Sequence, residues 1–247
     1  MSLIGRMLGR QRSRWPEFWQ TYPGMSADAP ALWLVDLGAV DAAPVSSLPV
    51  RVDITAPYPA GSDGLPTGHL AEADDAVRTA VGALGGAYLG RVASQGRCRY
   101  TAHLPSQPTA EVTFPDLPGA EVRVEYDPHW AYVRDTLAPD VRQHRMLADR
   151  DALALLAAEG DEFRAARAVA HVAFFTEEAA AEQAAAALRG DGFTGTVEPD
   201  GEGGFALTAV RNDPVAPPRI HDLSWGVQEM VERYGGTYDG WTCAVAA

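Results

Sequence analysis

The sequence contains no lysine, so arginine supplies all 20 basic side chains, against 33 acidic residues and a net charge of −13. An acidic surface repels the phosphate backbone of nucleic acids, so we expect no direct binding to DNA or RNA. Without lysine, the GxxxxGK phosphate-binding loop is also excluded. Two interpretations of the acidity remain open: it attracts a basic protein partner, or it only keeps the protein soluble.

Cysteine is scarce, with Cys98 and Cys243 as the two examples. Two cysteines are too few for a disulfide framework, and no CxxC pair indicates a zinc site, so we expect two buried thiols. No stretch approaches the roughly 18 apolar residues of a membrane-spanning helix. Residues 1–14 also lack the apolar core of a signal peptide. We therefore expect a cytoplasmic protein that does not contact a membrane.

Motifs of known catalytic chemistry are missing as well. The six histidines show none of the HxH, HxxxH or HExxH spacings of metal sites. No GxSxG occurs, and the glycines at 201–204 lie in a predicted hairpin rather than between a strand and a helix. We therefore expect no metal, no cofactor and no catalytic residue.

The chain is long enough for two domains, because it has 247 residues, of which 47% are hydrophobic. We expect a flexible basic arm at 1–14, a first domain at 15–138 and a second domain at 139–247. Residues 1–128 hold 10 arginines against 14 acidic residues, and residues 129–247 hold 10 against 19. The second half is therefore the more acidic.

The first domain reads as α+β, with an antiparallel sheet and one main helix. Leu70 to Leu84 has helical spacing of apolar residues, and Gly85-Gly86 ends it. An aromatic cluster at Trp15, Phe18, Trp19 and Tyr22 is expected to seal the edge of the core. The strands are predicted at 31–38, 49–56, 87–93, 97–104, 111–114 and 121–126.

The second domain shows the order β-α-β-β-α-β, which predicts a ferredoxin-like fold with both helices on one face of the sheet. Thr176 is the predicted N-cap of its first helix. Two more helices, at 131–137 and 140–158, are expected around the domain boundary. The strands are predicted at 167–175, 193–198, 204–210 and 237–245, and the second of the two β-α-β helices at 217–234.

The closing strand contains the segment Tyr238-Asp239-Gly240-Trp241. Strict alternation places Trp241 on one side and Tyr238 on the other, while Asp239-Gly240 indicates a bulge or a close backbone approach. Tyr238, Asp239 and Trp241 are candidates for contact with a partner, since tryptophan and tyrosine dominate binding hot spots. Packing in the core is the alternative for Trp241.

A second set of candidates lies near the predicted domain boundary. His129, Trp130 and Tyr132, together with His171, are expected to line a pocket between the domains, because clefts at domain interfaces often bind small molecules. The alternative for His129 and His171 is ordinary packing at the junction or within a strand.

Several segments resemble known families. The YDGW segment, with 228–236 before it, resembles the closing segment of the regulator of ribonuclease activity B family, and the resemblance extends over residues 142–247. Further matching positions are Gly160-Asp161, residues 167–171, Phe175, Leu188 and Gly192-Phe193. Residues 14–135, with Gly64-Leu65-Pro66 and the segment 127–130, are similar to domain-of-unknown-function family 695.

The resemblance implies a ferredoxin-like second domain and a non-catalytic role, because the family's namesake binds ribonuclease E outside its catalytic part and inhibits RNA cleavage. A protein-binding regulator of ribonuclease E-type RNA processing is thus the leading hypothesis, with a ribonuclease or its scaffold as the partner. The alternative is a small-molecule-binding protein or enzyme with its pocket at the domain interface. A purely structural role is a third reading.

Overall fold

The computed structural model describes residues 14–109, 114 and 117–246. The expected basic arm at 1–14, except for Arg14, and the expected strand at 111–114, except for Phe114, lie outside the described residues. The chain divides into two compact domains, one up to Pro139 and one from Asp140 on. Both are α+β, in agreement with the predicted fold class.

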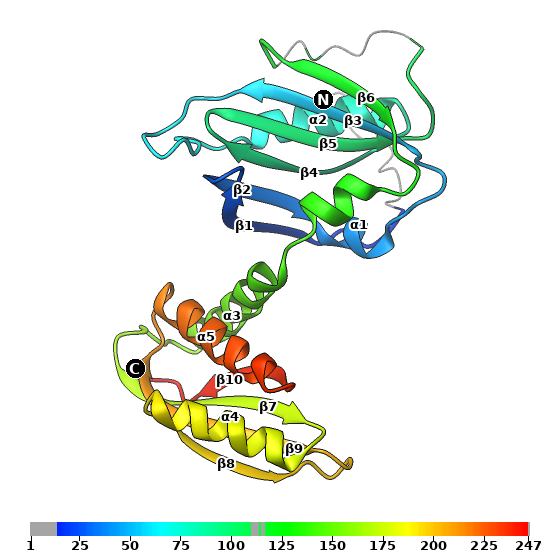
Figure 1. Ribbon diagram of the computed structural model, residues 1–247. Coiled ribbons are helices and arrows are strands. Elements are labelled where there is room, and N and C mark those ends of the chain that lie inside the picture. Colours follow the sequence, from blue (N-terminus) through cyan, green and yellow to red (C-terminus); the bar gives the residue numbers. More distant parts are fainter. Residues whose placement is uncertain (1–13, 110–113, 115–116, 247) are drawn as a thin grey trace, which may run out of the picture. The chain divides into compact units, whose positions relative to one another are not determined.

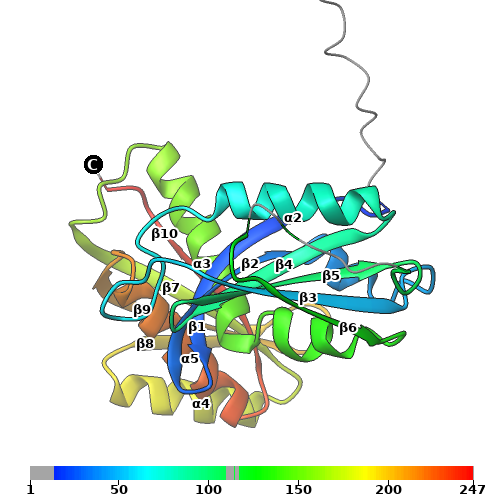
Figure 2. The ribbon, with the colours of Figure 1, turned by 90° about the horizontal axis from the view of Figure 1, so that it is seen from above.

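The first domain is built on an antiparallel sheet, with the strand order β1-β2-β4-β5-β3-β6 among the described residues. Helix α2 runs along one face of this sheet (Figure 2) and packs Val77 and Val81 into a core formed with β3, β4 and β5. The elements are β1 (Trp19–Ser26), β2 (Ala29–Asp36), α1 (Leu37–Ala42), β3 (Val50–Pro57), α2 (Ala71–Ala83), β4 (Ala87–Ser94), β5 (Arg97–Leu104), β6 (Glu121–Tyr126) and the π-helix η1 (Val133–Leu137).

Two of the four residues of the aromatic cluster lie in a strand that the sequence pattern did not predict. Trp19 and Tyr22 lie in β1, which forms a hairpin with β2 across Ala27 and Asp28. Both turn residues have positive φ, 48° and 63°, as a two-residue hairpin turn requires. Glycine or asparagine normally marks such a turn, so an alanine there gives no signal. The residues that were expected to cover the edge of the core thus include part of an edge strand of the sheet.

Strand β2 also ends earlier than the predicted range 31–38. Asp36 is the N-cap of α1, and its carboxylate accepts hydrogen bonds from the backbone N–H groups of Phe18 (2.8 Å) and Gly38 (3.1 Å). The indole of Trp15 donates a third bond, of 2.7 Å. The buried cap therefore stops the strand and connects it to the segment before β1.

Gly86 provides the first test of this fold. A Cβ at this position would lie 2.3 Å from Leu104 Cδ2 and 2.7 Å from the backbone oxygen of His103. We expect Gly86→Ala to lower the free energy of unfolding by about 1–3 kcal/mol, as overpacking does. Gly68→Ala is the matched control, because nothing lies within 4 Å of a Cβ there. Equal denaturant midpoints for the two variants would contradict this packing.

The second domain has the predicted ferredoxin-like arrangement, with the strand order β10-β7-β9-β8 among the described residues. Helices α4 and α5 cover one face of this sheet (Figure 1), and α3 packs beside α5. Glu177 rather than Thr176 is the N-cap of α4, and its side chain makes no capping bond. The elements are α3 (Val141–Ala158), β7 (Ala166–Phe175), α4 (Glu178–Gly190), β8 (Thr194–Pro199), β9 (Phe205–Pro214), α5 (Arg219–Arg233) and β10 (Thr237–Cys243).

A bulge at Asp239-Gly240 corrects the predicted sidedness of the closing strand. The register of β10 against β7 shifts between Tyr238 and Gly240, and Gly240 has a φ of 145°. The extra residue places Tyr238 and Trp241 on the same side, opposite Ala173 and His171 of β7. Strict alternation was therefore the wrong pattern for this strand, whereas the predicted bulge is confirmed.

Candidate functional site

Asp149 on α3 is the centre of a buried polar cluster in the second domain. Its carboxylate is fully buried and accepts the indole N–H of Trp241 at 2.8 Å and Nδ1–H of His221 at 3.1 Å. The hydroxyl of Ser224 and Nε–H of Arg145, at 3.1 Å, also donate to it. One carboxylate thus connects α3 to α5 and to β10.

His171 lies on the central strand β7, where it is paired with Trp241 of β10. Its Nδ1 shares a 2.7 Å hydrogen bond with the hydroxyl of Tyr238, and its ring lies edge-on to Phe193. Burial lowers the pKa of His171 to about 4, because the charged imidazolium would lose its hydration. The nearby charges of Asp213, Arg211, Asp149 and Arg145 act in both directions and are smaller effects. His171 is therefore neutral at physiological pH.

The cluster brings a hydroxyl, an imidazole and a carboxylate together, yet the geometry differs from that of a catalytic triad. The hydroxyl of Ser224 donates directly to Asp149 rather than to the imidazole of His221. A nucleophilic serine needs the imidazole as its base. The arrangement fixes three elements in place and does not activate Ser224.

The three predicted partner-binding residues, Tyr238, Asp239 and Trp241, differ in how far they are exposed to solvent. Tyr238 is 9% exposed and packs with α4 and α5, while Trp241 is half-buried next to α3. Arg145 lies over the Tyr238 ring at 5.2 Å. Asp239, in the bulge, is exposed. The two aromatic rings face the inside of the domain, and their contact with a partner remains a prediction.

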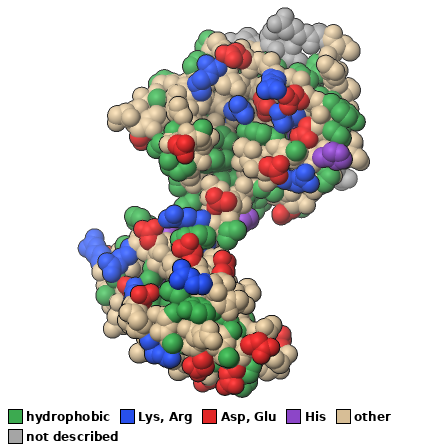
Figure 3. All heavy atoms as spheres, viewed as in Figure 1, with side chains coloured by type: hydrophobic (Ala, Val, Ile, Leu, Met, Phe, Trp, Pro, Cys, Tyr) green, Lys and Arg blue, Asp and Glu red, His purple; other side chains and the backbone are tan. Residues whose placement is uncertain are grey.

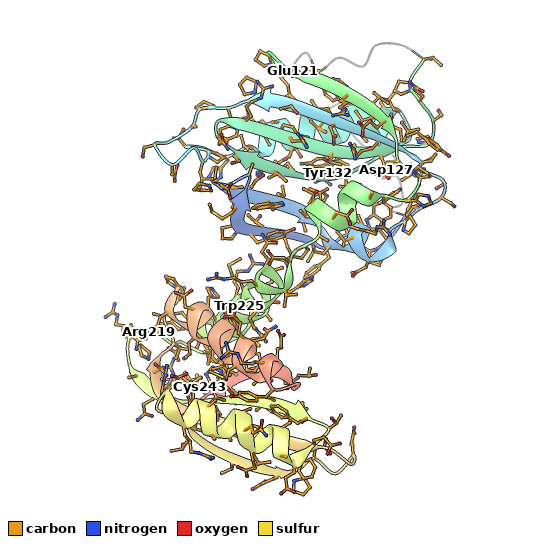
Figure 4. All side chains as sticks on the ribbon, in the orientation of Figure 1. Glu121, Asp127, Tyr132, Arg219, Trp225 and Cys243 are labelled. Carbon is orange, nitrogen blue, oxygen red and sulfur yellow. The ribbon has the colours of Figure 1, made fainter. Side chains whose placement is uncertain are left out.

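The predicted pocket residues of the first domain, His129, Trp130 and Tyr132, lie in the segment between β6 and η1. Tyr132 is labelled in Figure 4. Trp130 is fully buried, donates to the Leu48 carbonyl at 2.9 Å and packs on His103. Its φ of 54° is unusual for a bulky residue. Tyr132 lies under the guanidinium groups of Arg51 and Arg99, and His129 is exposed. A pocket between the domains, with His171 on its other side, stays a prediction.

The sheet of the second domain has a face that α4 and α5 do not cover, which we call the open face. Its residues are those that alternate with the buried ones in β7 and β9, and Phe174 on it is 40% exposed. Three rows of cross-strand neighbours cross the open face from β10 through β7 and β9 to β8. They are Thr237, Phe174, Ala206 and Glu198; Gly240, Val172, Thr208 and Thr196; and Thr242, Ala170, Val210 and Thr194.

The open face is nearly uncharged, although its domain is acidic. Among these residues, Glu198 at the edge carries the single charge, while the centre consists of valine, alanine and threonine. In Figure 3, acidic side chains gather instead at the end of the second domain where α4 begins and the β8–β9 turn lies. An exposed apolar surface of this kind is typical of a contact surface.

Potential metal ligands are not clustered in the described part of the chain. No group of three or more histidine, cysteine or acidic residues there is placed to hold a metal ion. Cys98 is buried, and burial raises the pKa of its thiol to about 12, so the thiol is unreactive. Cys243 is half-buried, which corrects the expectation of two buried thiols. Among the described residues, no helix is long and apolar enough to cross a membrane.

Sequence reasoning missed Asp149 and Ser224 and treated His221 as an isolated histidine. These residues and Trp241 are spread over α3, α5 and β10, so only the folded chain brings them together. The one local signal is the spacing of Arg145 and Asp149, four residues apart on one helix face. That spacing is equally typical of an exposed ion pair.

Each of the two domains matches the sequence model of a known family. Residues 17–138 match the sequence model of a family of unknown function, DUF695. Residues 147–243 match the sequence model of the regulator of ribonuclease activity B. No curated protein matches the chain significantly. The chain thus joins a domain that matches DUF695 to a domain that matches the regulator of ribonuclease activity B.

Proposed function

We propose that the protein is a non-catalytic regulator that binds a ribonuclease of the ribonuclease E type and modulates its cleavage of RNA. The observation that carries this proposal is the match of residues 147–243 to the regulator of ribonuclease activity B. The partner is a protein, and the contact requires no RNA. A net charge of −13 supports this, since the phosphate backbone is repelled.

The open face is the surface that we assign to this contact. Interface cores are depleted of charged residues, and the centre of the open face has none, with Ala170, Val172, Thr208 and Val210 side by side. Phe174 projects at its end with 40% of its surface exposed. We expect the bound ribonuclease segment to combine apolar residues with flanking arginines. The acidic residues around the open face would attract these arginines, because charges at the rim of an interface steer the two proteins together.

Charge introduced into the open face tests this assignment. We expect Val172→Glu or Phe174→Glu to weaken binding to the purified ribonuclease at least tenfold, about 1.4 kcal/mol, because the contact would bury an unpaired carboxylate. Ala179→Glu is the matched control: it adds the same charge at an exposed position of α4. Affinities measured by biolayer interferometry compare the variants, after circular dichroism shows that each is folded.

Two outcomes contradict the proposal at different levels. If the wild-type protein does not bind the ribonuclease at micromolar concentration, the partner is wrong. If it binds, and Val172→Glu and Ala179→Glu bind equally well, the partner stands and the open face is not the contact surface.

A further inference from the structure

The first domain contains a pocket of about 410 Å³, within the range of about 300–1,000 Å³ for small-molecule sites. It lies between the segment before β1, the second half of α2 and the start of β4. Its charged lining residues are Arg14, Glu17, Asp36 and Arg78. None of these residues takes part in the proposed ribonuclease contact, which lies in the other domain.

Arg78 lies in the pocket wall, stacked on aromatic rings, and its guanidinium donates no hydrogen bond to another described residue. Its guanidinium lies 4.5 Å from the centre of the Trp19 ring and 5.6 Å from that of Tyr88, and the two rings stack on each other at 5.5 Å. Nη1 of Arg78 forms a partly exposed ion pair with Oε2 of Glu17 at 3.6 Å, which is longer than a hydrogen bond. Cation–π contacts thus fix the plane of the guanidinium and leave its N–H groups available.

The acidic groups of the pocket are already engaged. Asp36 accepts three hydrogen bonds, from Trp15, Phe18 and Gly38, and Glu17 accepts the indole N–H of Trp19 at 3.0 Å. The carbonyl of Gly85, which would repel an anion, is covered by Nη2 of Arg14 at 3.2 Å. The guanidinium of Arg78 therefore has an ion-pair partner, Glu17, but no hydrogen-bonded carboxylate among the described residues.

We propose that this pocket binds a small organic molecule through a carboxylate or phosphate group held by Arg78. A planar guanidinium matches either oxyanion with two parallel N–H···O bonds. The volume of about 410 Å³ exceeds that of a lone anion, so the ligand has an organic body that lies against Gly82, Gly86 and Tyr88. Arg14 lies at the same pocket and supplies a second cation.

Four probes separate the parts of this proposal in the full-length protein. Phenyl phosphate and benzoate carry the two oxyanions on one ring, phenol lacks the anion, and inorganic phosphate lacks the ring. We expect phenyl phosphate or benzoate, at millimolar concentration, to shift the Arg78 Nε–H and Tyr88 backbone signals in ¹⁵N NMR spectra. Phenol should leave these signals unchanged, and inorganic phosphate should bind more weakly than phenyl phosphate. The better of the two aryl anions identifies the oxyanion.

Substitutions complete the test. Arg78→Gln should weaken binding of the better probe at least tenfold, and Arg78→Lys should weaken it less, because lysine keeps the charge but loses the planar fork. Arg123→Gln, at a 75% exposed side chain of β6, is the matched control and should bind like the wild type. The proposal is overturned if no anion shifts these signals, if phenol shifts them equally, or if Arg78→Gln and Arg123→Gln bind alike.

Discussion

Replacement of Asp149 by alanine is expected to destabilise the second domain by about 3–5 kcal/mol, the cost of removing one partner of a buried ion pair. Arg145, His221, Ser224 and Trp241 would each lose a hydrogen bond to the fully buried carboxylate. The loss should appear as a lower urea midpoint in unfolding followed by tryptophan fluorescence. Hydrogen exchange in α3 should accelerate, because α3 loses its bonds to α5 and β10.

Asp151→Ala is the control for this experiment, because Asp151 lies on the same helix and is exposed. Surface substitutions of this kind change stability by about 0.5 kcal/mol or less. Asp149→Asn should fall between the two, since an amide keeps the shape and one acceptor oxygen. If Asp149→Ala unfolds at the same urea concentration as Asp151→Ala, the cluster does not hold α3 in place.

Acid is expected to destabilise the second domain through His171. The pKa of His171 in the folded protein is lowered to about 4 from its ordinary value of 6.5, so between these values the unfolded chain binds a proton that the folded one does not. The free energy of unfolding is unaffected by the titration of His171 above pH 6.5 and falls by about 1.4 kcal/mol for each pH unit below that value. Over the whole window the loss is about 3 kcal/mol, and it is complete near pH 4.

Unfolding titrations at several pH values between 7 and 4 measure this loss. His171→Gln cannot titrate and keeps a hydrogen-bonding partner for Tyr238, so its stability should fall less steeply with pH than that of the wild type. His144→Gln removes an exposed histidine of α3 and should retain the wild-type slope. Parallel pH curves for His171→Gln and the wild type would show that His171 is not buried in its neutral form.

Much of the fold could be predicted because its signals are local. The apolar spacing of α2 and its glycine stop at 85–86, and the β-α-β-β-α-β order of the second domain, are both found in the structure. The turn between β1 and β2 could not be predicted, because Ala27 adopts a positive φ of 48° that its side chain does not favour. The bulge at Asp239-Gly240 was predicted from the glycine, but its effect on the side of Tyr238 was not.

The polar cluster around Asp149 was beyond sequence reasoning for a different reason. Helical geometry places Asp149 and Asp151 on opposite faces of α3, with Asp149 buried and Asp151 exposed. Which side chains surround Asp149 depends on tertiary contacts with α5 and β10. The pocket at Arg78 likewise depends on Trp19 in β1, a strand whose existence the sequence did not indicate. The open face, in contrast, follows from alternation in β7, with Ala170 and Val172 pointing away from His171.

The proposed regulation is tested most directly by the rate at which a purified ribonuclease E-type enzyme cleaves a single-stranded RNA while this protein is titrated into the reaction. We expect the cleavage rate to fall in a saturable manner with the wild-type protein and with Ala179→Glu. Val172→Glu should need at least a tenfold higher concentration for the same inhibition, in line with weaker binding. A cleavage rate that stays constant up to a large molar excess of wild-type protein would contradict a regulatory role.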